Sequence, residues 1–272
     1  MHTPRISAWD GLDHVPPVVD TTAADYKKYK ASMKYFDFMA LLAHGVGAIM
    51  VVLNGFVFGT ANGGFQWKTR AFNETDPELA PVDGLLNYHL FFSTVAFVFL
   101  QGEAIVTYRI HRHEIKFFTK IVHSAFHLAV ITVGGFSFAI MVHRNDVLKQ
   151  KQFTSFYSWL EIALLAVYVI QMFGAFIMFV FPRTSPKVQQ SVKPWHAGFG
   201  LLIFALSVIQ VVSRNMTYSV GDCEIALNCS SHLDYLHNFG VISIIIYAVL
   251  IGILVVNPNW KRQLTLDERK VD

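Results

Sequence analysis

Charged side chains are scarce in this sequence of 272 residues. Only 15% of the residues are Asp, Glu, Lys or Arg, whereas 53% are hydrophobic, and the mean hydropathy is +0.41. A typical soluble domain carries about 25% charged residues, so this composition argues against a soluble protein and favours a membrane protein. The net charge is only +3. No nucleic-acid-binding motif accompanies it, so no nucleic-acid partner is expected.

Six long apolar runs separate the charged segments. A helix needs about 20 residues to cross the ~30 Å hydrocarbon core of a bilayer, and an open sheet would leave backbone polar groups unpaired in lipid. The expected helices cover residues 36–58, 85–107, 119–142, 156–181, 196–212 and 235–256. The sequence therefore predicts an all-α integral membrane protein with six transmembrane helices at 36–258, between terminal segments at 1–35 and 259–272.

Lysine and arginine predict the orientation of these helices. No signal peptide is visible in the first 35 residues, and cytosolic loops carry the excess of basic residues in membrane proteins. With a cytosolic N-terminus, 16 of the 22 lysines and arginines fall in inner segments and six in outer ones. Both termini are therefore expected in the cytosol.

The outer loops carry features of the secretory pathway. Three N-glycosylation sequons, at Asn73, Asn215 and Asn228, all fall in segments predicted to be outside. The only two cysteines, Cys223 and Cys229, lie in the outer loop before the last helix. A small disulfide is expected in this oxidising compartment, with two free thiols as the alternative. A vesicle, lysosomal or plasma membrane fits these features.

Histidine is abundant, with twelve residues, several of them inside or beside apolar spans. A polar residue inside a membrane is costly and is therefore a functional candidate. His123 and His196 lie near the predicted cytosolic starts of the third and fifth helices, at equal depth. Two imidazoles at one level on facing helices are what bis-histidine ligation of haem b needs. Hydrogen-bonded core histidines are the alternative, and His44 is expected to be one.

Several motifs resemble the cytochrome b561 family. They are LNYH, ending at His89, then FLQGEAIVTYR, RHEIKFFTKIVHSAFH, KPWH before the fifth helix and NPNWKR after the sixth. The resemblance covers roughly residues 39–262. It implies a homodimer in which four central helices of each chain form a bundle around two haems. It also implies that His123 and His196 ligate the cytosolic haem iron, and that His89 ligates the outer one.

The fourth axial ligand departs from the family pattern. Where the family has a histidine near the start of the fourth helix, this chain has Tyr157, and the flanking serine and tryptophan residues fix the register. Glu161 replaces a glycine one turn deeper on the same helix face. Leu90 replaces the proline that usually follows the helix-two histidine. Three departures therefore fall on one site.

Three interpretations of the outer site stay open. Tyr157 could ligate the iron as a phenolate, which would lower its potential. A haem could instead be held by His89 alone, or with His143 or His237 as the second ligand. The third interpretation is that the outer haem is absent and that Tyr157, Glu161 and other side chains fill its volume.

A cationic helix face is predicted beside the cytosolic histidines. Lys116, Lys120, His123 and His127 share one face by their spacing, and Arg109 ends the second helix beside them. Ascorbate is a monoanion at neutral pH, so these cations would attract it, and the resemblance implies ascorbate binding at Arg109, Lys116 and Lys120. The cytosolic bias of basic residues would also place cations here. His127 is either a hydrogen-bond partner or a packed core residue.

Two functional classes remain. The resemblance implies an oxidoreductase that takes electrons from cytosolic ascorbate and passes them to monodehydroascorbate or ferric iron outside, at a substrate site near His143. The alternative is a single-haem protein that keeps only the cytosolic haem and acts in binding, sensing or as a scaffold. The departures at Tyr157 and Glu161 favour this alternative, because electron transfer across the membrane needs a complete outer relay.

Overall fold

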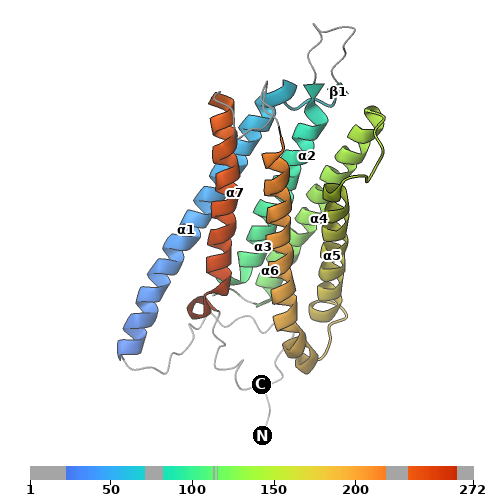
Figure 1. The fold of residues 1–272 in the computed structure, drawn as a ribbon. Coiled ribbons are helices and arrows are strands. Elements are labelled where there is room, and N and C mark those ends of the chain that lie inside the picture. The colour runs from blue at the N-terminus through green and yellow to red at the C-terminus, as the bar shows by residue number, and fades with distance from the viewer. Residues whose placement is uncertain (1–22, 71–81, 113, 115, 219–231, 262–272) are drawn as a thin grey trace, which may run out of the picture.

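The computed structural model describes residues 23–70, 82–112, 114, 116–218 and 232–261. Within these residues six segments are long and apolar enough to cross a membrane, which confirms the predicted fold class. The first is α1 (Ala23–Thr60), and the second joins α2 (Gly84–Thr94), the π-helical η2 (Val95–Leu100) and α3 (Gln101–Ile110). The others are α4 (Lys116–Val147), α5 (Phe156–Phe179), α6 (Pro186–Met216) and α7 (His232–Val256). Figure 1 shows them as one elongated bundle.

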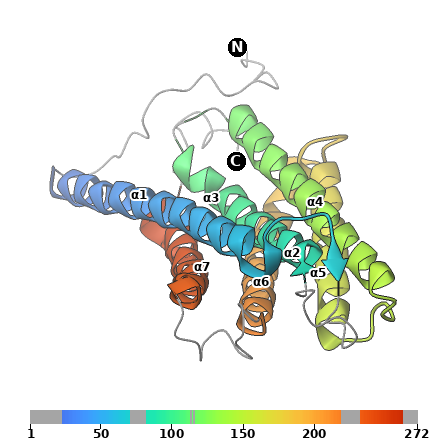
Figure 2. The same cartoon turned by 90° about the horizontal axis from the view of Figure 1, so that it is seen from above.

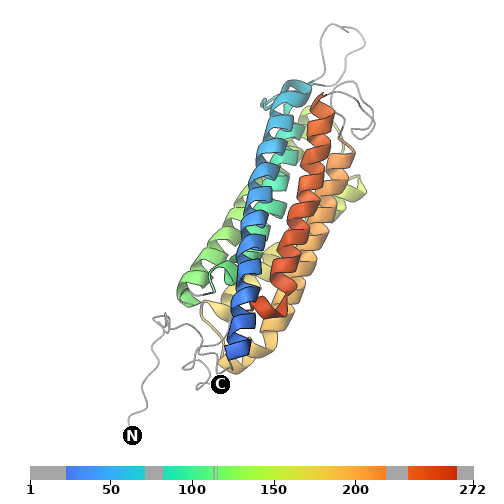
Figure 3. The ribbon, with the colours of Figure 1, turned by 90° about the vertical axis from the view of Figure 1, so that its left-hand side faces the viewer.

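The two ends of the bundle differ in their chemistry. The starts of α1, α4 and α6 lie together with the ends of α5 and α7 at one end (Figures 1 and 3). We call this the basic end, because Lys116, Lys120, Arg183 and Lys193 lie there. The opposite end, which we call the outer end, holds the short hairpin of β1 (Thr69–Arg70) and β2 (Val82–Asp83).

The second span lies at the centre of the bundle, and α5 lies at its edge (Figure 2). Helices α1 and α7 pack along one another, and α2 packs on α4. In the most apolar part of each span, 61% of the residues of the second span are buried, but only 6% of those of α5. Helix α5 contacts mainly α6 and, to a smaller extent, α4. It is therefore the least tightly packed wall of the bundle.

Large apolar side chains cover much of the outside of the bundle. Phe38, Ile49, Phe173, Ile209 and Phe239 are each more than half exposed. Soluble proteins rarely expose contiguous apolar surfaces of this kind, whereas such side chains suit the hydrocarbon core of a bilayer. The surface therefore agrees with six membrane-spanning helices.

Asp83 fixes the outer end. Its Oδ1 accepts hydrogen bonds from the backbone N–H of Leu86, which caps α2, and from the Thr69 hydroxyl at 2.8 Å. The Arg144 guanidinium on α4 donates to both carboxylate oxygens at 2.5–3.0 Å. This bidentate pair ties the hairpin and the start of α2 to α4.

A second polar cluster closes the outer end beside α6. The Tyr218 hydroxyl donates to Asn87 Oδ1 at 2.5 Å and accepts from Asn62 Nδ2 at 3.0 Å. Burial raises the pKa of Tyr218, so its hydroxyl remains protonated and able to donate. The ends of α1, α2 and α6 are therefore held together.

Two helices begin earlier than their apolar runs. Helix α4 begins at Lys116 and α6 begins at Pro186, so His196 lies well inside α6. A proline in the first turn is compatible with a helix because its missing N–H has no partner there, and Pro194 follows within the same helix. The extra turns are polar, so hydropathy alone could not reveal them.

Candidate functional site

The rings of His123 on α4 and His196 on α6 lie close together near the basic end. Their centres are 6.3 Å apart, and the ring planes are inclined by 79°. Two imidazoles that bind one metal ion through nitrogen at about 2.0–2.1 Å have ring centres roughly 6 Å apart. The structure therefore brings the predicted pair together at a spacing that suits an iron atom between them.

Both rings are held through Nδ1, which leaves Nε2 for a metal. His123 Nδ1 lies 2.7 Å from the carbonyl oxygen of Ala104 and can donate its hydrogen to it. His196 Nδ1 lies 3.0 Å from the amide of Gln171, whose Nε2 also donates to the His196 carbonyl at 2.9 Å. Metal ligation through Nε2 leaves the proton on Nδ1, and the Gln171 oxygen can accept it after the amide turns. The sequence analysis missed Gln171; a polar side chain inside an apolar span was the available signal.

His127 has a specific partner behind this pair. Its Nδ1 lies 2.5 Å from the hydroxyl of Tyr168, a buried residue of α5. Its ring also packs edge-on against His123, with centres 4.3 Å apart. Of the two interpretations left open by the sequence, the structure shows the hydrogen-bonded one. His127 and Tyr168 thus connect α4 to α5 and support the His123 ring.

Four cations gather at the basic end. Lys120 Nζ donates to the carbonyl of Phe179, the last residue of α5, at 3.1 Å. Lys116, Arg183 and Lys193 lie near enough to interact electrostatically with Lys120. The sequence analysis had assigned Arg183 and Lys193 only to orientation, because nothing in their spacing shows that the turn before α6 returns to the start of α4.

Arg109 lies in a different environment. Its guanidinium donates to the carbonyls of Asn257, at 3.1 Å, and Val255, at the end of α7. The residue is only 8% exposed. These bonds cap α7, and the structure describes no contact between Arg109 and the predicted partners Lys116 and Lys120.

His44 is not a core residue, so that prediction was wrong. Its side chain is 44% exposed, and its Nδ1 lies 3.2 Å from Glu103 Oε1. Glu103 also accepts a hydrogen bond from the Tyr247 hydroxyl at 3.0 Å. His44 therefore covers a buried carboxylate at the edge of α1.

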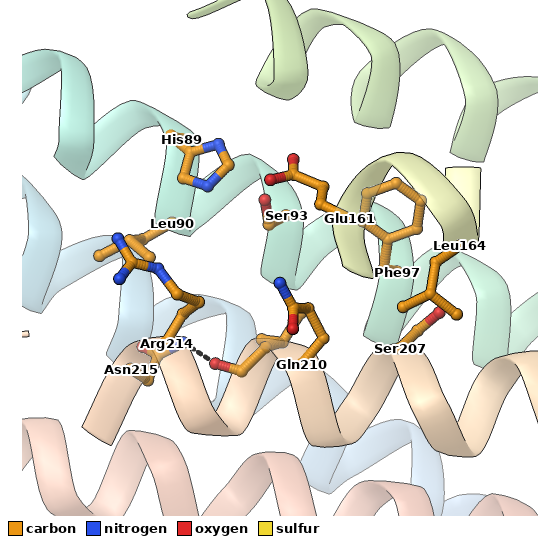
Figure 4. A pocket seen from close by; sticks show the side chains of 11 residues that line it. His89, Leu90, Ser93, Phe97, Glu161, Leu164, Ser207, Gln210, Arg214 and Asn215 are labelled. Carbon is orange, nitrogen blue, oxygen red and sulfur yellow. Dashed lines mark hydrogen bonds between the residues drawn. The ribbon is translucent and has the colours of Figure 1, made fainter. Parts of the chain in front are cut away.

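His89 lines a cavity nearer the outer end. Its Nδ1 lies 3.1 Å from the Ser137 carbonyl, and the Ser137 hydroxyl donates to the His89 carbonyl at 2.8 Å. The cavity encloses about 450 Å³ of empty space between α2, η2, α5 and α6. Figure 4 shows His89 and Glu161 pointing into it from opposite helices, with Arg214 and Gln210 on α6. A ligand site of this size is common in proteins.

Tyr157 does not line this cavity. Its ring lies beside the Arg214 guanidinium, 5.1 Å from the ring centre, and its backbone carbonyl accepts from Gln210 Nε2 at 2.9 Å. Glu161, one turn deeper, does line the cavity, and its Oε1 is buried without a hydrogen-bond partner. The structure therefore brings Glu161, and not Tyr157, to the space beside His89.

The other histidines considered for this site lie elsewhere. His143 is exposed at the outer end and stacks on Trp67, with ring centres 5.7 Å apart. His237 Nε2 lies 3.0 Å from the carbonyl of Asn215 and is positioned to donate to it. Neither residue lines the cavity with His89.

The predicted outer modifications are only partly within the described residues. Asn73, Asn228, Cys223 and Cys229 lie outside them. Asn215 is described and is completely buried, and its Nδ2 donates to the Val211 carbonyl at 2.8 Å. A glycan on this nitrogen would require the end of α6 to open.

The two histidine sites differ in how well they fit a haem. At the basic end, two imidazoles at the spacing of a single ion have their Nε2 atoms free of hydrogen bonds, so the residues fit an iron with two histidine ligands. At the outer cavity, His89 is oriented in the same way, but no imidazole lies among the lining residues opposite it. A bis-histidine haem therefore fits the first site and does not fit the second.

Comparisons with known proteins agree with this architecture. The family described as eukaryotic cytochrome b561 matches residues 88–219. A Caenorhabditis elegans protein, named as a homolog of the transmembrane ascorbate-dependent reductase CYB561, is 27% identical over 248 residues, covering 87% of this chain and 89% of its own. Proteins named transmembrane ascorbate-dependent reductase CYB561 also match. The Bos taurus protein is 25% identical over 82% of this chain and 84% of its own, and the Homo sapiens protein is 30% identical over 60% of each. The six-helix chain therefore belongs to the cytochrome b561 family.

Proposed function

We propose that this chain is a haem b transmembrane oxidoreductase that takes electrons from cytosolic ascorbate and passes them to an acceptor outside, monodehydroascorbate or ferric iron. The observation that carries this proposal is the His123–His196 pair, with ring centres 6.3 Å apart. The relatives named as ascorbate-dependent reductases support the choice of donor.

The residues at the basic end have distinct roles in this proposal. Haem b, when bound, supplies an iron that gains and loses one electron. His123 and His196 would hold the iron through Nε2, while Ala104 and Gln171 fix the two rings through Nδ1. The second shell of hydrogen bonds orients such ligands and raises their basicity.

The cations would bind the donor. Lys116, Lys120, Arg183 and Lys193 lie together beside the histidine pair, and ascorbate carries one negative charge at neutral pH. A cluster of one sign raises the local concentration of an oppositely charged substrate, and salt weakens this effect. A polar, basic end is therefore suited to receive ascorbate from the cytosol.

The proposed orientation places the basic end in the cytosol, together with both termini. The proposal includes a secretory-pathway membrane, glycans at Asn73 and Asn228, a disulfide between Cys223 and Cys229, and a homodimer. The excess of lysine and arginine in the inner segments supports the orientation.

A second function is a single-haem protein that binds or senses ascorbate without moving electrons across the membrane. It is favoured by the replacement of the expected histidine by Tyr157, which lies outside the cavity that His89 lines. The two functions are distinguished by electron flow across a sealed membrane.

The test uses the full chain in sealed vesicles that contain ascorbate and are surrounded by ferricyanide, with the inserted orientation determined by protease protection. Vesicles whose chains present the basic end to the lumen should reduce ferricyanide at least tenfold faster than protein-free vesicles. Haem reduction without ferricyanide reduction would select the single-haem function. A chain whose haem ascorbate does not reduce would contradict both functions.

A further inference from the structure

We infer that Glu161 supplies an oxygen ligand opposite His89 to a second haem, held in the cavity between α2, η2, α5 and α6. This inference rests on the proposed function, because it assumes that the bundle binds haem at the basic end. It replaces the two-imidazole centre expected from the family with a centre that has one nitrogen and one oxygen ligand. It also assigns a role to a residue at which the sequence departs from the family pattern.

His89 is oriented as a metal ligand would be. Its Nδ1 faces the Ser137 carbonyl at 3.1 Å, just as His123 Nδ1 faces the Ala104 carbonyl at 2.7 Å. In both cases the carbonyl belongs to the other member of the packed pair formed by α4 and the second span. Ser137 also bonds the Ser93 hydroxyl at 2.9 Å, which fixes this serine pair beside the ring. His89 therefore presents Nε2 to the cavity, since Nδ1 is occupied.

Glu161 has an oxygen that lacks a partner. Its Oε1 is buried and accepts no hydrogen bond, and none of the ion pairs described for this chain includes it. A buried carboxylate oxygen without a donor or a cation is costly, so it is expected to have a partner in the functional protein. Figure 4 shows the carboxylate directed into the cavity from α5, towards the side on which His89 lies. An iron between the two groups would satisfy both.

The rest of the cavity suits a flat, mostly apolar ligand with acidic groups. Leu90, Phe97 and Leu164 line it with apolar surface. Arg214 adds a guanidinium whose described hydrogen bond, to Thr217, is long at 3.5 Å. Haem b carries two carboxylates, and arginine is the preferred partner of a carboxylate in such sites.

The cavity also has a connection towards the outer end. Leu90 and Arg214 line both this cavity and a second one, of about 500 Å³, that reaches Asp83 and Tyr218. The loose packing of α5, of whose apolar part only 6% is buried, leaves room for a ligand between α5 and α2. The second haem would therefore lie on a route from the membrane interior to the outer end.

A carboxylate ligand changes the properties of the iron. An anionic oxygen stabilises ferric iron more than an imidazole does, so the outer haem should be reduced at a lower potential than the His123–His196 haem. Oxygen donors are also weak-field ligands, so ferric iron with His89 and Glu161 should be high-spin, whereas two imidazoles give low-spin iron. The two haems can then be observed separately in one sample.

The test measures the haem content and the ferric electron paramagnetic resonance spectrum of the purified full chain. The expected result is two haems per chain, one low-spin and one high-spin. Glu161→His should convert the high-spin signal to a second low-spin signal at the same haem content. Tyr157→Phe, which changes the neighbouring oxygen donor on α5, should leave both signals unchanged. His89→Ala should remove the high-spin haem and keep the low-spin one.

Three results would overturn the inference. One low-spin haem per chain would show that the cavity holds no haem, while the proposed site at the basic end would stand. A high-spin signal that responds to Tyr157→Phe and not to Glu161→His would assign the ligand to Tyr157. Two low-spin haems in the unmodified chain would require a nitrogen ligand opposite His89. Absence of the low-spin signal would instead contradict the proposed function itself.

Discussion

At the scale of single residues, the histidine ligands are defined as much by the atoms behind them as by the rings. Ala104, Gln171 and Ser137 each contact the Nδ1 of one histidine, His123, His196 and His89 respectively. A ring held in this way presents one defined nitrogen to a metal. Of these three partners only Gln171 is a side chain that can be changed without altering the backbone.

Replacing Gln171 should tune the haem at the basic end. In Gln171→Leu the haem should remain bound, but its midpoint potential should rise by roughly 40 mV, because losing a hydrogen bond of about 1 kcal/mol weakens the donation of electrons by His196. Gln171→Glu should lower the potential, since a carboxylate accepts from Nδ1–H more strongly. A spectroelectrochemical titration measures both changes.

The matched control is Gln189→Leu. Gln189 lies in the first turns of α6, and its amide donates to the Thr184 carbonyl, away from both rings. Its replacement should leave the potential unchanged. Equal potentials in Gln171→Leu, Gln171→Glu and the unmodified chain would show that Gln171 does not act on the ligand.

At the scale of helices, the contact between the start of α4 and the turn before α6 creates the cationic cluster. Lys116 and Lys120 come from α4, whereas Arg183 and Lys193 lie on either side of the start of α6. Lys120 also donates to the last carbonyl of α5, so replacing it would disturb a helix end. Arg183 and Lys193 are therefore better targets for a binding test.

The double variant Arg183→Gln, Lys193→Gln should bind ascorbate more weakly. Removing two exposed charges near the donor site should raise the KM for ascorbate by roughly 3- to 10-fold, since each such charge contributes about 0.2–1 kcal/mol. The dependence of KM on salt should also become shallower, because fewer charges remain to be screened. Steady-state reduction of the haem at several ionic strengths measures both effects.

Lys187→Gln provides the control for this variant. Lys187 lies in the first turn of α6 but is not among the cations that interact with Lys120. If the double variant matched the unmodified chain in KM and salt dependence, the cluster would serve only the orientation of the chain in the membrane.

The helices were predictable from the sequence, but the inward-facing residues of α5 were not. Apolar runs identify the spans, because the length needed to cross a bilayer is fixed. The starts of α4 and α6 lie in polar turns, so hydropathy ended those helices too early. Gln171, Tyr168 and Glu161 all lie on α5, whose apolar residues are nearly uniform around the helix. Which face turns inward is decided by tertiary packing, so only the structure relates these three side chains to the histidines.

At the scale of the whole molecule, the histidines form two levels in one bundle. His123 and His196 could be paired from their equal depth, whereas the site of His89 could not be completed, because Tyr157 occupies the expected position of its partner. The structure leaves a cavity beside His89 and brings Glu161 to it. The proposed electron path therefore begins at a site that two imidazoles define and continues through a site with different chemistry.

The haem content of histidine variants tests the central claim most directly. Purified full chains carrying His123→Ala or His196→Ala are compared with the unmodified chain by pyridine haemochrome assay, with protein quantified separately. Each variant should lose one haem per chain and the low-spin signal. His111→Ala, a histidine at the same end of the bundle but outside the pair, should lose neither. A His123→Ala or His196→Ala chain that kept its full haem content would contradict the account.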